Sequence, residues 1–595
     1  ATGREHHTKR LAILFEGLDD LKHKLTLILN NEDIVGKDIY FGEYKLVSSE
    51  HTNKSMGKIS IEQQLENGQK AEKLLQKILN EKHTNRENIQ NIAKLFISGA
   101  DIKWQKYYSL TNAETISIPR YCFEKYRCWF SLPNRPEKKE VSCYKLSWIK
   151  EKNEIVKEEI EECDNVVIIS VSDNELAFKL KERISAKGIS VKTVEVEKDI
   201  NLIHHFESRL TQFWSNYDGT KIRIIYMLEG IDVRDSGTDN LDMFYVFIRS
   251  LKTLKSSRTT INLLAYNSFK ITTSENTVPI NTSICGLLNM VRLEFPEWKC
   301  RIYDIAEDIS EEFLEKQILL SNGDFLKALR KGVVYVPILR RVNVENKKSS
   351  IPLVFKDNGI YIVSGGLGDV ALHIIKQITL LKKAVFILLS RKKVDDHNVL
   401  PTEMKTKISE IEANGSIVDI QCCDVSNRHE VEKCINTIRE KYGKLNGVIH
   451  AAGVSGNKLL AMETLENFKN IYKPKILGAY NLDLATRNDS LDFFIMFSSI
   501  ATYLPAPGQG SYVAANAYLD SFASHRNATI KKNTTYTINW STWKECGMGK
   551  RTGVNVDTAF KAITNEEGWD GFEKFLKSQE ENLLVGIINE SGKYA

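Results

Sequence analysis

The spacing of apolar residues in the first part of the chain, residues 1–135, is mainly helical. Three runs there repeat apolar positions with the period of an α-helix: 10–15, 21–29 and 62–82. We expect helices in all three, with a loop at the polar segment 48–60. An aromatic-rich run, 118–130, is followed by Pro133 and Pro136, and we expect it to lie along a neighbouring surface rather than to fold by itself.

Residues 141–350 change to an alternating α/β pattern. Short runs rich in β-branched residues alternate there with helical stretches: 166–170, 222–226 and 261–265. Such alternation is typical of a parallel sheet covered by helices. The first strand leads into Ser-Val-Ser-Asp-Asn-Glu (170–175), which has no glycine that would let a pyrophosphate approach the backbone. We therefore expect a nucleotide-type fold without a nucleotide site.

The same alternation returns in residues 351–595, now with a glycine-rich turn. A strand, the turn Ser-Gly-Gly-Leu-Gly-Asp, an apolar-faced helix and a second strand follow one another: 360–363, 364–369, 370–381 and 384–389. This order is one βαβ unit of a dinucleotide-binding fold.

The length of the chain favours several folded units, because 595 residues are too many for one hydrophobic core. We expect a flanking region at 1–135, a structural subdomain at 141–350 and a catalytic subdomain at 351–595. The fold class is α/β: two Rossmann-like, doubly wound parallel-sheet subdomains preceded by a small α/β flanking region.

Composition excludes several classes of protein. Hydrophobic residues at 42% and charged residues at 27% are ordinary for a globular protein, and no apolar run approaches the roughly 18 residues of a membrane span. The N-terminus has no apolar core typical of a signal or transit peptide, so we expect a stretch of a longer polypeptide. A net charge of +5 is too diffuse for nucleic acid. The ten cysteines show no C-x-x-C spacing and are interpreted as reduced cytoplasmic thiols.

The ends of the first two catalytic-half strands carry the features of a cofactor site. The turn would present backbone N–H groups and a helix dipole to a pyrophosphate through Ser364, Gly365, Gly366, Leu367, Gly368 and Asp369. The next strand ends at Ser390 and Arg391, where folds that prefer NAD hold an acid, whereas a cation accommodates a 2′-phosphate. This favours NADPH over NADH.

Two later strand ends complete the candidate cofactor site. An adenine-contacting turn and the nicotinamide half would lie at Asp424, Val425, Ala451, Ala452 and Gly453. The alternative is that a glycine-rich turn and a surface arginine occur without a ligand. His450 and the pair Cys422 and Cys423 are assigned to packing, because nothing nearby offers a second metal ligand or a base, and no metal is expected.

A catalytic constellation for ketone reduction stands further along the chain. Tyr512 follows Ser499 by thirteen residues, Asn516 comes four residues later, and Lys475 stands upstream. Reduction of a ketone needs a proton on oxygen, and tyrosine is a poor donor at neutral pH unless its phenolate is stabilised. A nearby ammonium lowers the tyrosine pKa, and a serine hydroxyl can hold the carbonyl oxygen. Tyr512 and Asn516 at i and i+4 share one helix face.

These residues lie in stretches that resemble a known family. The segment Phe-Ser-Ser-Ile-Ala-Thr-Tyr-Leu-Pro-Ala-Pro-Gly-Gln-Gly-Ser-Tyr-Val-Ala-Ala-Asn-Ala-Tyr-Leu-Asp (497–520) is similar to the active-site stretch of polyketide synthase ketoreductase domains, members of the short-chain dehydrogenase/reductase superfamily. Residues 472–480 and 538–543, the latter the start of the substrate lid, extend the match. The resemblance implies that Tyr512 donates the proton, Ser499 orients the carbonyl, and Lys475 with Asn516 completes a relay.

The resemblance covers nearly the whole chain. Residues 284–297, which include Leu-Glu-Phe-Pro-Glu, and 335–339 are similar to the structural subdomain of these ketoreductases. Residues 2–12 resemble the linker after a ketosynthase in synthases whose acyltransferase acts in trans, and 118–124 resemble the tail that wraps back onto the ketosynthase. The first unit is thus expected to be a flanking or acyltransferase-docking region.

The function implied is NADPH-dependent reduction of a β-ketoacyl thioester to a hydroxyacyl thioester, in the manner of a 3-oxoacyl-carrier-protein reductase. The resemblance implies three partners: an acyl carrier protein bearing the substrate on phosphopantetheine, the ketosynthase of the same synthase, and an acyltransferase acting in trans. Neither nucleic acid nor a membrane is expected as a partner, and the expected location is the cytoplasm.

The chain departs from the family pattern at two places. In the glycine-rich turn, Asp369 and Ala371 stand where glycines are usual, and a carboxylate repels a pyrophosphate unless its side chain points away. After Val454, domains giving the D-hydroxy product usually show Leu-Asp-Asp, whereas this chain has Ser-Gly-Asn (455–457). The tryptophan of the opposite class would fall at Leu504. The missing acid favours the L-hydroxy product.

Two further functions remain as alternatives to an active reductase. A reductively inactive scaffold that docks the acyltransferase and carrier domains is favoured by Asp369 and the large N-terminal unit, and opposed by the intact catalytic residues. A free-standing dehydrogenase for a soluble metabolite is disfavoured because 350 residues precede the catalytic subdomain.

Overall fold

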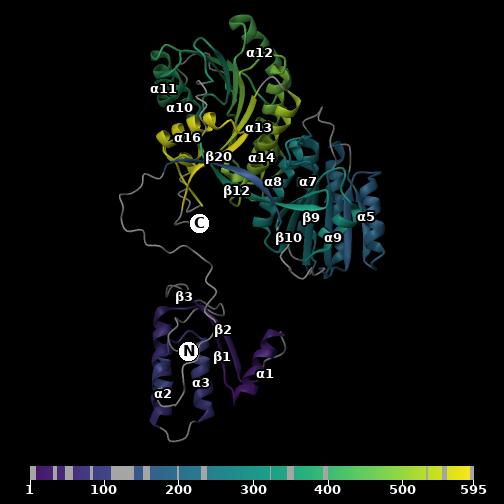
Figure 1. Cartoon of the computed structure of the whole chain (residues 1–595), viewed down its shortest axis with the longest axis vertical. Coiled ribbons are helices and arrows are strands. Elements are labelled where there is room, and N and C mark those ends of the chain that lie inside the picture. Colours follow the sequence, from purple (N-terminus) through teal and green to yellow (C-terminus); the bar gives the residue numbers. More distant parts are fainter. Residues whose placement is uncertain are drawn as a thin grey trace. The chain divides into compact units, whose positions relative to one another are not determined.

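The computed structural model describes fourteen segments of the chain: 8–30, 36–46, 58–80, 85–108, 140–151, 161–196, 200–228, 237–256, 258–321, 323–344, 354–392, 400–530, 534–552 and 559–589. The aromatic run 118–130 and residues 48–57 of the expected loop lie outside them. The chain divides into two compact units, Ala1–Leu132 and Pro133–Ala595 (Figure 1). Within the described segments, no helix combines the length and apolar character needed to cross a bilayer.

The first unit combines short strands with helices. Its elements are β1 (Lys9–Ile13), α1 (Leu18–Leu29), β2 (Ile39–Glu43), β3 (Lys45–Leu46), β4 (Lys58–Ile59), α2 (Ile61–Asn80), α3 (Arg86–Ile97) and α4 (Trp104–Tyr108). The helices expected at 21–29 and 62–82 are confirmed. Buried apolar side chains of α2 and α3, among them Leu75 and Ile92, form a small core between them.

The helix expected at 10–15 is wrong, because this segment forms β1 and pairs antiparallel with β2. Arg10 is buried, and its guanidinium donates to the carbonyl of Phe96 (2.9 Å) and the hydroxyl of Tyr44 (2.9 Å). The same group lies over both rings, 4.9 Å from the Tyr44 centroid and 4.8 Å from that of Phe96. Six residues are too few for periodicity to separate helix from strand, and these partners, distant in sequence, stabilise the strand.

The second unit begins with a structural half that confirms the strands expected at 166–170, 222–226 and 261–265. Its elements are β5 (Ser142–Lys150), β6 (Asn165–Ser170), α5 (Glu175–Ser185), β7 (Ser190–Glu195), α6 (Ile203–Trp214), β8 (Lys221–Met227), α7 (Thr238–Ser250), β9 (Arg258–Tyr266), α8 (Pro279–Glu294), β10 (Trp298–Ile305), α9 (Glu311–Leu319), β11 (Leu326–Arg330) and β12 (Val333–Val342).

The catalytic half repeats the alternation. Its elements are β13 (Ile360–Ser364), α10 (Asp369–Thr379), β14 (Val385–Ser390), α11 (Thr402–Ala413), β15 (Ile417–Cys422), α12 (Arg428–Tyr442), β16 (Gly447–His450), α13 (Leu465–Thr486), β17 (Phe493–Ser499), α14 (Gly510–Thr529), β18 (Thr534–Trp540), α15 (Gly547–Thr552), β19 (Phe560–Lys561), α16 (Asn565–Ser578) and β20 (Asn582–Ile588). The expected strand, turn, helix and strand at 360–389 are confirmed.

The strands of both halves join in one sheet, which confirms the α/β fold class. Its order is β15-β14-β13-β16-β17-β18-β20-β5-β12-β11-β10-β9-β8-β6-β7. In this order the strands from β15 to β20 pair in parallel, as do those from β11 to β7, whereas β5 is antiparallel to both β20 and β12, and β12 is antiparallel to β11. β5 and β12 therefore connect the two parallel halves.

Helices α8 and α14 pack where the two halves meet (Figure 1). A Cβ built on Gly286 of α8 would come within 2.9 Å of the Cβ of Ala517 of α14, so the helix backbones approach closely. Ser283 adds a hydrogen bond from its hydroxyl to the carbonyl of Ala514 (2.7 Å). The hydrophobic core runs through this contact and contains residues of both halves.

Candidate active site

The glycine-rich turn lies between β13 and α10, at the carboxyl edge of the sheet. Gly365 has a φ of 64°, and a Cβ there would come within 2.7 Å of the backbone of Ala452, so only glycine lets the turn pass this close to the end of β16. In the described structure no side chain caps α10 at Gly368. The first N–H groups of the helix therefore form a cradle that fits a pyrophosphate.

The other residues of the turn are held by contacts with the protein interior. Ser364 is buried, and its hydroxyl lies 2.6 Å from Nδ1 of His450. A Cβ on Gly366 would come within 2.8 Å of the carbonyl oxygen of Val363. Leu367 packs against the core of the catalytic half. The turn is thus held in place by packing before any ligand binds.

Asp369 has a counter-ion that sequence reasoning missed. Its carboxylate lies 3.2 Å from Nζ of Lys407 on α11, and the same ammonium lies 3.1 Å from Glu403. Burial lowers the pKa of Lys407, but its hydrogen bonds to Glu403 and Asp369 outweigh this and raise it. The lysine therefore stays charged and offsets the negative charge that Asp369 brings to the turn.

Ser390 and Arg391 lie at the end of β14, which pairs with β13. The Arg391 side chain is exposed, and the Ser390 hydroxyl accepts a hydrogen bond from the N–H of Lys392 (3.2 Å). A guanidinium at this strand end can meet a 2′-phosphate, which it binds with planar, charged donors.

The next two strand ends hold the other predicted cofactor residues: Asp424, Val425, Ala451, Ala452 and Gly453. The Asp424 carboxylate accepts from the N–H of Ser426 (2.9 Å), and Val425 is buried. A Cβ on Gly453 would come within 2.7 Å of Cε of Lys475. The structure therefore brings all predicted cofactor residues to one sheet edge, and the end of β16 lies against the predicted catalytic lysine.

Tyr512 stands in the first turn of α14, facing the end of β17. Burial raises the pKa of its hydroxyl, and hydrogen bonds with Ser499 and Asn516 oppose this rise. Nδ2 of Asn516 donates to the carbonyl of Tyr512 (2.8 Å), while its buried Oδ1 has no partner among the described residues. The tyrosine thus stays protonated at neutral pH beside a serine hydroxyl, with an amide oxygen left to accept from water.

The side chain of Lys475 extends from α13 to the end of β17, near Ser499. It is 4% exposed, and Nζ donates to the carbonyl of Phe497 (2.6 Å), two residues before Ser499. Burial lowers the lysine pKa to about 8, and the charge of Asp520 opposes the shift. Nε2 of His450 donates to the Lys475 carbonyl (3.0 Å), Nδ1 accepts from the Ser364 hydroxyl, and burial lowers the pKa of the ring to about 3. His450 is therefore a neutral, packed histidine, as expected.

Sequence reasoning missed a polar pair behind these residues, in which Asn539 is buried and Asp520 is half-buried. Nδ2 of Asn539 lies 2.8 Å and 3.0 Å from the two carboxylate oxygens of Asp520, and it also lies near the hydroxyl of Ser498 (3.1 Å). Burial raises the pKa of Asp520 to about 7, against hydrogen bonds that lower it. Asp520 is four residues beyond Asn516, on the same face of α14, and that spacing was the available signal.

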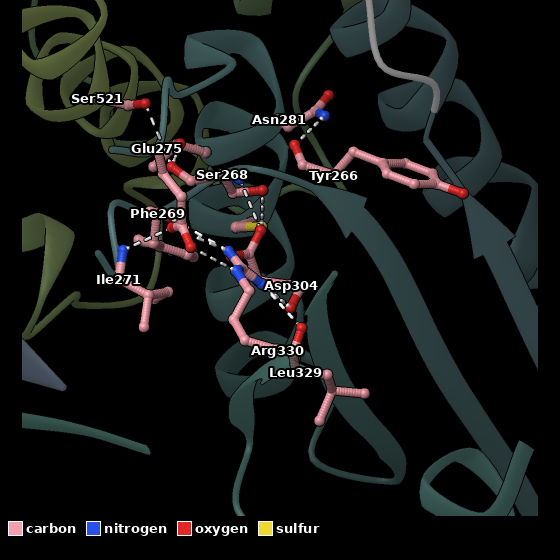
Figure 2. Close-up of polar contacts among 12 residues, drawn as sticks. Tyr266, Ser268, Phe269, Ile271, Glu275, Asn281, Asp304, Leu329, Arg330 and Ser521 are labelled. Carbon is pink, nitrogen blue, oxygen red and sulfur yellow. Dashed lines mark hydrogen bonds and ion pairs between the residues drawn. The ribbon is translucent and has the colours of Figure 1, made fainter. Parts of the chain in front are cut away.

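At the equivalent edge of the structural half, the protein's own side chains fill the part at the ends of β10 and β11 (Figure 2). Arg330 donates to Asp304 (2.6 Å) and to Glu275 (3.0 Å), and Asp304 accepts from the N–H of Ser268 (2.6 Å). Burial raises the pKa of Asp304 to about 6, which Arg330 opposes. A cleft of about 500 Å³ at the ends of β6 and β9 is lined in part by Asp173, Glu175, Glu307 and Glu311. Lys179 also lines the cleft and pairs with Glu175 (2.8 Å) and Glu311 (3.0 Å), so these residues together carry a net negative charge that is unfavourable for a pyrophosphate. A half without a nucleotide site stays a prediction.

In the described segments, no group of three His, Cys, Asp or Glu side chains is placed to bind a metal ion.

Comparison with known proteins identifies the family. Residues 359–545 match the family model described as KR domain. Polyketide synthase PksN of Bacillus subtilis (strain 168) is 29% identical over 285 residues, which are 47% of this chain and 5% of PksN. Polyketide synthase PksM of the same organism is 24% identical over an alignment of 622 residues, covering 98% of this chain and 14% of PksM. The chain therefore spans only a small part of these relatives.

A solved structure shows the same fold. The N-terminal ketoreductase from the macrolactin assembly line superposes with a TM-score of 0.63 at 19% identity, covering 76% of this chain and 93% of that one. The family match and the fold together indicate that residues 359–545 are a Rossmann-fold oxidoreductase of the short-chain dehydrogenase/reductase type. Residues 359–545 match the KR domain and the curated relatives are polyketide synthases, so the expected resemblance to polyketide synthase ketoreductase domains is confirmed.

Proposed function

We propose that this chain reduces the ketone of a carrier-bound β-ketoacyl thioester to a hydroxyacyl thioester with NADPH. The observation that carries the proposal is the meeting of Tyr512, Ser499, Lys475 and Asn516 at the sheet edge that also holds the glycine cradle. A proton donor, a carbonyl-orienting hydroxyl and a dinucleotide cradle are what ketone reduction requires in one place.

The residues divide the work of the reaction. The hydroxyl of Ser499 and the phenol of Tyr512 hold the ketone oxygen, and Tyr512 gives that oxygen its proton as the C=O bond becomes a C–O single bond. A dinucleotide held by the turn residues 364–369 would supply the hydride that the carbonyl carbon receives. Lys475 stabilises the phenolate left behind, and a water held by Oδ1 of Asn516 returns a proton to it.

Preference for NADPH follows from the exposed Arg391 at the end of β14, because a guanidinium binds a 2′-phosphate and a carboxylate at this position would bind ribose hydroxyls. The residues of the turn, 364–369, would hold the pyrophosphate. Asp424 and Val425 would contact the adenine, and 451–453 the nicotinamide half.

The substrate and partners are proposed from the relatives, which are polyketide synthases by name. An acyl carrier protein would deliver the substrate on phosphopantetheine. A ketosynthase of the same synthase and an acyltransferase acting in trans would flank the first unit, in the cytoplasm. The Ser-Gly-Asn segment at 455–457 favours the L-hydroxy product.

The test is NADPH oxidation at 340 nm with trans-1-decalone or a β-ketoacyl-N-acetylcysteamine thioester. Tyr512→Phe removes the proton donor and keeps the ring, so we expect kcat to fall by about 10²- to 10⁴-fold. Tyr518→Phe, a buried tyrosine of the same helix, is the matched control and should retain activity. Equal turnover by wild type and Tyr512→Phe would refute the assigned role.

A second function, a non-reducing scaffold, is favoured by the large N-terminal unit and by Asp369, which stands at a turn position where the resembling family usually has glycine. A titration of NADPH binding by fluorescence separates the two functions. Binding together with turnover supports the reductase, whereas neither binding nor turnover in wild type supports the scaffold.

A further inference from the structure

The end of α8 reaches from the structural half into the catalytic half. Its last residue is Glu294, the first of the two glutamates of the Leu-Glu-Phe-Pro-Glu motif. One carboxylate oxygen, Oε2, accepts a hydrogen bond from the N–H of Leu460 (2.6 Å), and the other, Oε1, accepts from the N–H of Gly508 (2.8 Å). One side chain therefore fastens two backbone segments that are almost fifty residues apart in sequence.

The two fastened segments flank the catalytic residues. Residues 454–460 continue from the end of β16, where the nicotinamide half would lie, and 503–509 run from the β17 end at Ser499 into the helix that carries Tyr512. The N-cap of that helix, Gln509, makes no capping hydrogen bond with its side chain in the described structure. A carboxylate contributed by α8 lies there instead, where negative charge is favourable to a helix.

A second carboxylate supports the same junction. Glu463 is buried, and its Oε1 accepts from the hydroxyl of Ser511 (3.0 Å), the neighbour of Tyr512. A Cβ on Gly456 would come within 3.0 Å of the Ser511 hydroxyl oxygen. The 454–460 segment therefore lies directly against the first turn of α14, and its position and that of Tyr512 are coupled.

The geometry of the reaction links the 454–460 and 503–509 segments to the configuration of the alcohol product. Tyr512 and Ser499 would hold the ketone oxygen, and a dinucleotide held by residues 364–369 would deliver hydride to only one face of the ketone. Rotating the substrate by half a turn about its C=O axis exchanges its two arms and presents the opposite face to the hydride. Only the walls around the two arms can discriminate between these two orientations.

We propose that Glu294 is a positioning residue that holds the 454–460 and 503–509 segments at a fixed separation and thereby sets which face of the ketone is reduced. This inference rests on the proposed reductase function. A bridging carboxylate suits the task because it can accept two hydrogen bonds at once, and charge-assisted bonds to N–H groups are stronger than neutral ones. A glutamine has one acceptor oxygen, so its NH₂ group would face one of the two N–H donors.

The test compares Glu294→Gln with Glu297→Gln, an exposed glutamate of the same motif that receives the same substitution. Each protein reduces a β-ketoacyl-N-acetylcysteamine thioester, and chiral chromatography separates the two alcohol configurations. For Glu294→Gln we expect the minor configuration to rise about tenfold relative to the major one, while Glu297→Gln keeps the wild-type ratio. In parallel, hydrogen–deuterium exchange of peptides covering 454–460 and 503–509 should become faster only in Glu294→Gln.

The readouts distinguish positioning from a general loss of stability. A slower Glu294→Gln enzyme with an unchanged product ratio and unchanged exchange would overturn the proposal. If Glu294→Gln unfolds by circular dichroism, Glu294→Asp keeps the carboxylate but shortens its reach, and the same shift in ratio is expected. A wild-type protein without turnover would refute the reductase function and the stereochemical role with it, while the exchange data would still show whether Glu294 fastens both segments.

Discussion

At the scale of one residue, burial of the predicted catalytic Lys475 lowers the stability of the folded protein. The ammonium is almost completely buried, and burial lowers its pKa from the usual value near 10.5 to about 8. The unfolded chain then binds the proton more tightly than the folded one. Below pH 8 the folded protein therefore carries a penalty of about 3 kcal/mol, which decreases as the pH rises from 8 towards 10.5.

Replacing this lysine should change how stability depends on pH. In Lys475→Met the penalty is absent at every pH, so the stability of the variant relative to wild type should be greatest near pH 7 and should decrease steadily towards pH 10. The lost bond to the Phe497 carbonyl shifts all values equally and leaves the slope intact. Thermal unfolding across this pH range measures the difference in stability between Lys475→Met and wild type, and Lys433→Met, at an exposed lysine, is the control. A constant difference would contradict the lowered pKa.

The candidate catalytic residues could be predicted from the sequence because their chemistry is carried by fixed spacings. Ser499, Tyr512 and Asn516 stand on one strand end and one helix face, so local geometry already places them together. Glu294 and Lys407 could not be predicted in this way. Glu294 and Lys407 contact residues of other elements, and the spacing of neighbouring residues in the sequence does not indicate such contacts.

At the scale of elements, α10 and α11 decide how the unusual Asp369 is tolerated. Two ion pairs join these helices: Asp369 with Lys407 (3.2 Å) at the glycine-rich turn, and Lys376 with Glu410 (2.9 Å) further along. Only the first lies where a pyrophosphate would bind. The helix pair therefore supplies the positive charge that the turn itself lacks.

Removing that charge should weaken cofactor binding. In Lys407→Ala the Asp369 carboxylate loses this counter-ion, and we expect the Kd for NADPH to rise about 5- to 10-fold at low salt and less at high salt. Lys376→Ala breaks the other ion pair and should leave the Kd unchanged. In the double variant Asp369→Gly/Lys407→Ala, binding should return close to wild type. Equal weakening by both single lysine variants would mean that helix packing, and not charge, is responsible.

The elements of the second unit were predictable because buried parallel strands and amphipathic helices produce apolar runs or periodic apolar positions that extend over many residues. The strand at 360–363 and the helix at 370–381 are found with small shifts as β13 and α10. The segment 10–15 was predicted as a helix and forms β1. Its strand state depends on pairing with β2 and on the buried Arg10, which are non-local.

At the scale of the whole second unit, the structural half supports the catalytic half. β5 and β12 join the two parallel runs of the sheet, and α8 packs closely on α14, the helix that carries Tyr512. Gly286 of α8 also faces Val513, whose Cγ1 would lie 3.4 Å from a Cβ at that position. The catalytic helix is thus backed by a subdomain with no predicted catalytic residue.

Widening this contact should impair catalysis from a distance. In Gly286→Val a larger side chain has no room beside Ala517, so we expect a loss of about 1–3 kcal/mol in stability and at least a roughly tenfold drop in reductase kcat as Tyr512 shifts. Gly68→Val is the control, because a Cβ on this helical glycine of the first unit meets nothing closer than 3.7 Å. Calorimetry and the 340 nm assay measure both effects. An unchanged kcat in a folded Gly286→Val protein would show that α8 does not position the catalytic helix.

The sequence by itself determined the α/β class, the glycine-rich turn and the spacing of the proposed catalytic residues, because periodicity, turn chemistry and short-range geometry are written into neighbouring residues. Tertiary structure alone decided that Lys407 lies beside Asp369, that Glu294 bridges Leu460 and Gly508, and that β5 joins the two halves in one sheet. These contacts depend on which distant segments the fold brings within hydrogen-bonding range. A single sequence encodes that outcome only through the free energy of the whole chain.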